Sequence, residues 1–148
     1  MKKWILTVFG VQPILGKRVA AIDEKIERIA MYPFGNTLEQ CAQIIYLNGY
    51  KARLVNLKIM ADVISKRIGQ DRAKDLAAYA AGKSAREIAS TNGNNQFTVY
   101  RRIMKSVAEA TEELEDCGYD ERKMDRDYGG MKFIRAVMAG LEGKLRGK

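Results

Sequence analysis

The sequence predicts an all-α fold with a helical N-terminal part, a central pair of helices joined by a tight turn, and a C-terminal amphipathic helix. Only two prolines occur in 148 residues, and 47% of the residues are apolar, which is enough for a packed core. Apolar residues recur at steps of three and four along most of the chain, as on one face of a helix. We expect three parts: 1–69, 70–117 and 118–148.

The first residues resemble a secretory signal only superficially. Lys2 and Lys3 precede an apolar run over 4–15, but Gln12 and Pro13 interrupt this run and no small-residue cleavage site follows. The run is also too short to span a bilayer. We predict a short strand or an extended arm that packs on the body of the protein, and no membrane partner.

Two helices are expected next. Apolar residues at three- and four-residue steps predict a helix over 17–31, and the segment 32–36, which contains proline and glycine, ends it. Thr37 and Gln40 have the spacing of a capping box, which predicts a second helix that runs through Leu47. Asn48 and Gly49 then form a turn signal.

One regular apolar stripe follows over 47–68. Its members alternate steps of three and four throughout: Leu47, Tyr50, Leu54, Leu57, Ala61, Ile64 and Ile68. This spacing is typical of a coiled-coil seam. The stripe therefore indicates either packing against the preceding helices, which we favour because three heptads are short for an independent dimer, or a homodimer through 47–68. Gly69 is expected to end the helix.

The last helices are read from shorter patterns. A helix over 70–81 has a face of small residues and leucine, and Gly82 ends it; that face is Leu76, Ala77, Ala80 and Ala81. The acidic stretch 109–127 is interpreted as a solvated helix end. A final helix over 131–145 is apolar on one side, so it either covers the core or forms a homodimer; its apolar residues are Phe133, Ile134, Val137, Met138, Leu141 and Leu145.

The positive charge is concentrated in the middle of the chain. The net charge is +8, and residues 51–105 alone hold twelve Lys or Arg against four Asp or Glu. Residues 1–50 have a net charge of +2 and residues 106–148 a net charge of −2. A concentrated basic segment attracts polyanions such as DNA, and the alternative is a solvated basic face.

Several classes of function are excluded by composition. The chain has no histidine, and its two cysteines, Cys41 and Cys117, lie far apart. Zinc sites, serine-histidine-aspartate triads and cysteine-histidine pairs are therefore absent from the sequence, and the acidic clusters lack the pattern of a metal site. We expect no enzyme, no cofactor and no metal. Two lone thiols suit a reducing cytoplasm, and we expect both to be buried.

The segment 82–107 carries the strongest pattern. Ser84 and Glu87 form a capping box that begins a helix, whose inward residues are Ile88 and Ala89. Gly93 provides the positive φ of a tight turn, and Asn95 caps a second helix. The inner face of that helix is Val99, Ile103 and Val107.

The outward positions of the second helix suit DNA. Thr98, Arg101 and Lys105 point away from its inner face, and the side-chain amides of Asn95 and Gln96 suit adenine. Arg101 suits guanine. The expected phosphate contacts are Lys83, Arg86, Arg102 and Lys105, and Tyr100 completes the predicted DNA-binding set.

These residues resemble a known family. The run GKSAREIA, a turn with glycine and the run TVYRRI are similar to region 4 of sigma-70-type factors and to LuxR-type helix-turn-helix domains. With a helical part ahead of it, the motif resembles that of small phage-encoded regulators of the ArpU type. The resemblance covers about 70–115, and it implies binding to promoter DNA and, in true sigma factors, contact with RNA polymerase.

The motif departs from the family at three positions. Asn92 and Asn94 occupy positions where the family usually has apolar residues that anchor the turn, so either this packing is weaker or Phe97 fills the gap. Phe97 itself lies where a polar residue that faces DNA is common. Nothing corresponds to the promoter-melting region, so a complete sigma factor is not expected.

We therefore expect a sequence-specific transcriptional regulator of phage or prophage origin that reads double-stranded DNA with helix 96–107. Two alternatives stay open. A phage DNA-packaging protein, like a small terminase subunit, would grip DNA with little sequence preference and form a ring. A protein-interaction module would contact RNA polymerase without binding DNA, and would bury Arg101 and Lys105 in that contact.

Overall fold

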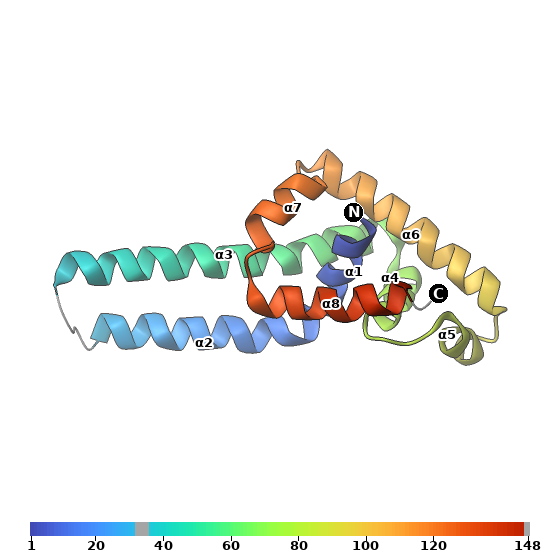
Figure 1. The fold of residues 1–148 in the computed structure, drawn as a ribbon, viewed down its shortest axis with the longest axis horizontal. Helices are drawn as coiled ribbons and strands as arrows, with labels where there is room; N and C mark the ends of the chain where they lie inside the picture. Colours follow the sequence, from blue (N-terminus) through green and yellow to red (C-terminus); the bar gives the residue numbers. More distant parts are fainter. Residues whose placement is uncertain (32–35, 147–148) are drawn as a thin grey trace. The chain divides into compact units, whose positions relative to one another are not determined.

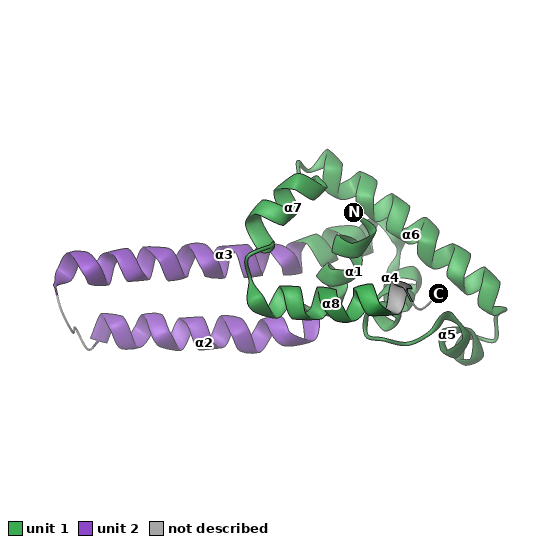
Figure 2. Ribbon diagram, viewed as in Figure 1, with its two compact units in different colours: residues 1–11, 60–148 green, residues 12–59 purple. Residues whose placement is uncertain are grey.

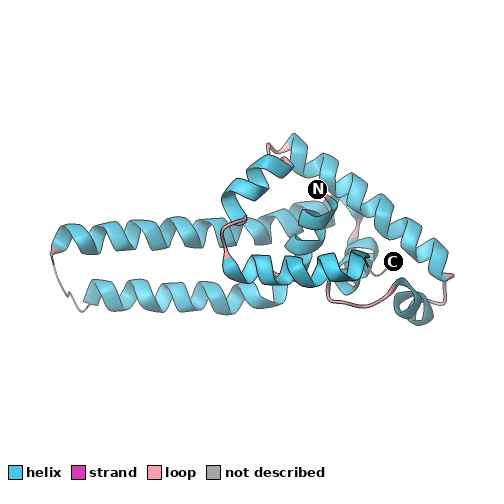
Figure 3. Cartoon of the chain, viewed as in Figure 1, coloured by secondary structure: helices cyan, strands magenta, loops and turns pink. Residues whose placement is uncertain are grey.

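The computed structural model describes residues 1–31 and 36–146, and side chains as far as residue 143. This part of the chain contains eight helices and no strand, which confirms the all-α prediction (Figures 1 and 3). The helices are α1 (Lys2–Gly10), α2 (Gln12–Met31), α3 (Thr37–Ile68), α4 (Gln70–Ala80), α5 (Ala85–Asn92), α6 (Gln96–Asp116), α7 (Glu121–Tyr128) and α8 (Lys132–Arg146).

The chain forms two compact units (Figure 2). The first unit combines residues 1–11 with residues 60–148, and the second unit is 12–59. The boundaries expected after residues 69 and 117 do not coincide with this division. Both of them fall inside the first unit, because α1 packs against α4, α6 and α8 and so links the beginning of the chain to its second half.

The N-terminal segment is a helix, so the prediction of a strand or an extended arm is wrong. Six consecutive residues of α1, from Trp4 to Phe9, are buried. A helix that is buried on all sides has no polar stripe, and its sequence therefore lacks the periodicity by which a surface helix is recognised. Trp4 also donates a hydrogen bond of 2.7 Å from Nε1 to Oδ1 of Asp125, and its ring lies 6.5 Å from that of Tyr128.

The second unit is a helical hairpin of α2 and the first part of α3. Three contacts join the two antiparallel helices: Gln40 to the carbonyl of Ile29, Lys51 to Asp23, and Gln12 to the carbonyl of Leu57. Helix α2 begins earlier than the expected residue 17. Pro13 lies in its first turn, where a missing N–H costs nothing because that group has no partner within the helix.

Helix α3 differs from the prediction at two places. Its N-terminal cap is Asn36, whose side chain accepts a hydrogen bond of 2.8 Å from the amide of Glu39, and not Thr37. The helix also continues through Asn48 and Gly49, so the predicted turn is wrong. The cost of a glycine inside a helix is only about 1 kcal/mol, and the burial of apolar residues on both sides of it outweighs that cost.

The 47–68 stripe is buried within this chain, as intramolecular packing requires. Leu47, Leu54 and Leu57 are buried in the second unit, and Ala61, Ile64 and Ile68 in the first, while Tyr50 is half-buried. Helix α3 ends at the expected place, where Gly69 has a φ of +90°.

Helix α4 buries only half of the predicted face: Leu76 and Ala80 are buried as predicted. Ala77 and Ala81 are exposed, and the buried residues are Ala73, Leu76, Tyr79 and Ala80, with Asp75 among them. Tyr79 is completely buried. The pattern was wrong at Ala77 and Ala81 because alanine is compatible with either side of a helix, whereas a tyrosine ring contributes far more buried area than a methyl group.

The part after residue 117 is more than a tail. Asp120 caps α7, a helix that the sequence did not reveal, and Met124 and Tyr128 in it are fully buried. Helix α8 agrees with the predicted final helix: Phe133, Ile134 and Leu141 are buried, and Lys132 and Arg135 are exposed. Val137 and Met138 are half-buried, while the side chain of Leu145 lies outside the described ones.

Among the described helices, none is by itself long and apolar enough to cross a membrane. Helices α1 and α2 meet the criteria of length and composition only when they are counted together, and the helix is interrupted between them.

We predict that the first unit depends on α1. Leu6 is fully buried, so Leu6→Ala should lower the free energy of unfolding by about 2–5 kcal/mol through lost burial and the resulting cavity. Urea unfolding followed by the fluorescence of Trp4, the only tryptophan, measures this change. Met31→Ala removes a side chain that is 63% exposed and should change stability by less than about 0.5 kcal/mol. Equal effects of the two substitutions would contradict a structural role of α1.

Candidate nucleic-acid interface

Helices α5 and α6 are joined by a turn of three residues, 93–95. The side chain of Ser84 accepts a hydrogen bond of 3.2 Å from the amide of Glu87, so the predicted cap of α5 is confirmed. Gly93 ends this helix with a φ of +71°, a left-handed conformation that is strained for other residues. Asn95 caps α6 by accepting a hydrogen bond of 2.8 Å from the amide of Phe97.

The two faces of α6 are separated as the sequence predicted. Val99, Ile103 and Val107 are buried, and in α5 so are Ile88 and Ala89. On the opposite face Thr98, Arg101 and Lys105 are exposed. Within the described part of the chain, neither Arg101 nor Lys105 makes an ion pair. The face therefore presents one hydroxyl and two positive charges to solvent.

The other predicted contact residues are exposed, with one exception. The side chains of Lys83, Arg86, Asn95, Gln96 and Tyr100 are exposed. Arg102 is only half-buried at the flank of α6, and its NH2 group lies 3.8 Å from a carboxylate oxygen of Asp75. A guanidinium that is already paired within the protein is less available to phosphate than its neighbour Arg101.

Asp75 is a structural residue that the sequence analysis missed. Its carboxylate, on α4, accepts a hydrogen bond of 3.1 Å from Nδ2 of Asn92 at the end of α5, and its other oxygen faces Arg102 on α6. One nearly buried carboxylate thus joins all three helices around the turn. The sequence did hold a sign of this role: Asp75 lies on the apolar face of α4, between Ala73 and Leu76. A carboxylate is buried only where it has partners.

The departure at Asn92 is resolved by this contact. Where the resemblance led us to expect an apolar residue, the amide of Asn92 donates a hydrogen bond to the Asp75 carboxylate, so the turn is held by a polar contact. The side chain of Phe97 is 64% exposed and does not fill the gap, so that alternative is wrong. Instead, Phe97 and Tyr100 line an open groove of about 390 Å³ with Arg86 and the first residues of α5.

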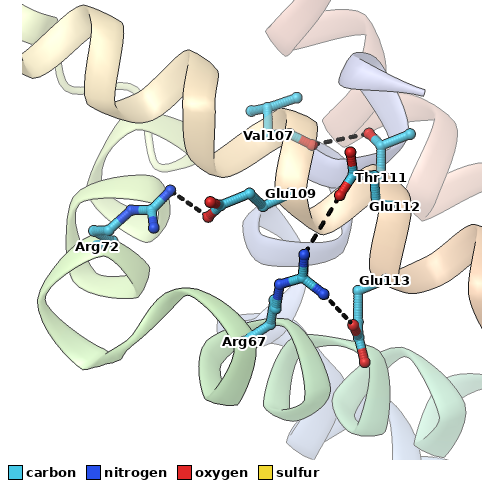
Figure 4. A network of polar contacts seen from close by, with 7 residues as sticks. All are labelled: Arg67, Arg72, Val107, Glu109, Thr111, Glu112 and Glu113. Carbon is cyan, nitrogen blue, oxygen red and sulfur yellow. Dashed lines mark hydrogen bonds and ion pairs between the residues drawn. The ribbon is translucent and has the colours of Figure 1, made fainter.

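The acidic half of α6 is engaged within the first unit and is not merely solvated (Figure 4). Arg67 of α3 reaches Glu112 at 3.4 Å and Glu113 at 3.2 Å. Arg72 of α4 pairs with Glu109 at 2.6 Å and also donates a hydrogen bond from Nε to Oγ of Ser106. These contacts fix the orientation of α6 and neutralise three of its carboxylates.

The pair between Arg72 and Glu109 affects the basic face directly. Lys105 and Glu109 are four residues apart on α6, a spacing at which opposite charges commonly attract each other. Glu109 is instead held by Arg72, whose Nη2 lies 2.6 Å from Oε2 of Glu109. Lys105 is left without an ion-pair partner in this part of the chain, and its charge adds to that of Arg101.

Neither cysteine is buried, contrary to the prediction. Cys41 and Cys117 are both exposed and both free. No group of three or more Cys, Asp or Glu residues is placed to hold a metal ion in the part of the chain that the structure describes.

Comparison with known proteins gives no relative: no family model, no curated protein and no solved structure matches this chain.

We predict that Asp75 couples α4 to the turn. Asp75→Ala leaves the amide of Asn92 and the charge of Arg102 without their partner, so it should lower the free energy of unfolding by about 1–3 kcal/mol. Asn92→Ala should lower the free energy of unfolding by less, because the Asp75 carboxylate then still contacts Arg102 and solvent. A double-mutant cycle in urea should give a coupling energy of at least about 0.5 kcal/mol. Strictly additive effects would show that the contact does not hold the turn.

Proposed function

We propose that α5 and α6 form a helix-turn-helix that binds double-stranded DNA, and that the protein is a sequence-specific transcriptional regulator of phage or prophage origin in the cytoplasm. One observation carries the proposal. Thr98, Arg101 and Lys105 share an exposed face of α6, while the opposite face of the same helix is anchored in the core by Val99, Ile103 and Val107. A helix held firmly on one side and basic on the other suits the major groove.

The unpaired cations on α6 support DNA binding because of where they lie. Four cations of the basic middle segment are paired with carboxylates within the chain: Lys51, Arg67, Arg72 and Arg102. Arg86, Arg101 and Lys105 have no such pair in the described structure, and neither do Lys58, Lys66 and Lys74, but only Arg101 and Lys105 share the exposed face of α6. Exposed cations that stay unneutralised attract a polyanion and release its counterions.

The side chains on this surface divide into two roles. The guanidinium of Arg101 matches the two acceptors of guanine, and the amide of Gln96 in the first turn matches adenine. Lys83, Arg86 and Lys105 would contact phosphates, as would the first amides of α6. Tyr100 and Asn95 lie at the edge of this surface, where hydroxyl and amide groups bind backbone oxygens.

The groove beside Phe97 favours a second candidate, contact with a protein such as RNA polymerase. Phe97 is 64% exposed and Tyr100 is 36% exposed, and both line the groove of about 390 Å³. Aromatic side chains that are exposed beside a groove are common at protein interfaces. A phenylalanine at a DNA surface has a smaller role, which is limited to apolar contact with thymine methyl groups.

We predict that Arg101→Ala/Lys105→Ala weakens DNA binding and makes it less dependent on salt. Loss of a phosphate contact should reduce the slope of log K against log salt by about 1. Loss of a base contact should cost about 1–3 kcal/mol and relax the preference at one position. Selection on a random duplex pool measures the sequence preference. Fluorescence anisotropy on the selected sequence at two salt concentrations measures the affinity and its salt dependence.

Lys132→Ala/Arg135→Ala is the matched control, because it removes the same charges from exposed positions of α8. Equal losses in the two variants would indicate attraction by net charge alone. Binding without sequence preference would favour a packaging protein. No binding even at low salt would rule out DNA binding and favour the second candidate, contact with a protein. In that last case Phe97→Ala should abolish capture of RNA polymerase.

A further inference from the structure

Helix α3 has a second apolar stripe, opposite the buried one. It runs from Leu38 to Ile59 and alternates steps of three and four: Leu38, Cys41, Ile45, Asn48, Ala52, Val55 and Ile59. We call these seven residues the outer stripe. All seven side chains are exposed; Leu38 is 82% exposed and Ile45 is 71% exposed. No charged residue interrupts the stripe over its three heptads.

Exposed apolar residues are concentrated in this hairpin. Six of the eight large apolar side chains that are exposed in the described structure lie between residues 12 and 59, and four of these belong to the outer stripe. Single exposed apolar residues are ordinary, whereas a continuous row of them marks a surface that another molecule covers. A helix that is apolar on both faces is usually buried on both faces.

We propose that the outer stripe is the interface with a second copy of this chain, whose hairpin packs antiparallel against the first. The heptad spacing of the stripe is that of helices that pair through knobs-into-holes packing. The same row serves both partners in a two-fold pair, so the surface must be complementary to itself. A stripe without charge meets this condition, since no like charges meet, and Asn48 is the kind of single polar residue that fixes the register of such a seam.

The distribution of charge along the two helices of the hairpin favours the antiparallel orientation. In the half of the hairpin near Met31 and Thr37, residues 20–42 hold four carboxylates and two cations. In the other half, residues 12–19 and 43–59 hold five cations and no carboxylate. A parallel pair would bring the two basic halves together, whereas an antiparallel pair places each basic half beside the acidic half of its partner, and complementary charges fix the register of an interface.

The interface differs from both dimer surfaces that the sequence suggested. The 47–68 stripe is buried within the chain, and the apolar residues of α8 up to Leu141 are buried or half-buried. Pairing through the outer stripe does not require either of these surfaces to leave its contacts within the chain. It gives the assembly two copies of the α5–α6 surface, but the pairing itself does not depend on DNA binding.

The test is the oligomeric state of the full chain by sedimentation equilibrium. We expect a dimer at tens of micromolar, and Ile45→Glu should raise the dissociation constant roughly a hundredfold or more by placing a charge in the seam. Ile45 is exposed in the single chain, so helicity and the thermal midpoint of the diluted variant should match those of the diluted wild type. Tyr46→Glu is the matched control: it changes an exposed neighbour outside the stripe and should leave the dimer intact.

A monomeric wild type would overturn the proposal, and so would a dimer that Ile45→Glu does not weaken. A dimer that binds no DNA would support this interface and contradict the proposed function, so the two proposals fail separately.

Disulfide formation tests the orientation. In a Cys117→Ser background, Cys41 is the only thiol, and in an antiparallel seam it lies opposite the region 52–59 of its partner and far from the partner's Cys41. Oxidation of this protein should therefore give little covalent dimer. Adding Ala52→Cys, Val55→Cys or Ile59→Cys, one at a time, should give efficient cross-linking for at least one position. Efficient cross-linking through Cys41 alone would show a parallel pair and overturn the antiparallel model.

Discussion

The first unit depends on the burial of α1. The helix consists of only nine residues, yet six of them are buried, and it packs against α4, α6 and α8. Each of these helices buries an apolar face, and without α1 each of the three would lose part of its cover. The segment that carries the candidate DNA surface is consequently not a separate module of the fold: α4 and α6 are completed by residues that lie at the other end of the chain.

On this apolar base, two polar contacts determine how the basic surface is presented. Asp75 joins the end of α5 to α4 and α6, and Arg72 holds Glu109 in the middle of α6. Both are partly buried pairs, in which a missing partner costs more than the complete pair contributes. Such pairs favour one arrangement over others, which is what a DNA-binding surface needs, since its side chains must match a fixed pattern of bases and phosphates.

The sequence predicted most accurately those features that depend on local chemistry. The caps at Ser84 and Asn95, the left-handed Gly93 and the buried residues of α6 all follow from interactions within a few residues. Features set by tertiary contacts were missed. Helix α1 lacks a polar face, Asn48 and Gly49 are held in a helix by packing, and Asp75 finds its partners 17 and 27 residues further along the chain. No local pattern identifies such partners, so the orientation of the candidate surface had to come from the structure.

The basic excess of the middle segment illustrates why charge alone is a weak indicator of function. Twelve cations lie between residues 51 and 105, but several of them serve the fold: Arg67 and Arg72 neutralise carboxylates of α6, and Lys51 joins the two helices of the hairpin. What distinguishes the candidate surface is that Arg101 and Lys105 lie together on the exposed face of α6, and neither makes an ion pair in the described structure even though Glu109 is within reach of Lys105 along the helix. Arg72 engages that carboxylate, so Lys105 keeps its charge free for the exposed face of α6. A substitution of Arg72 would therefore change the charge of a surface to which Arg72 itself does not belong.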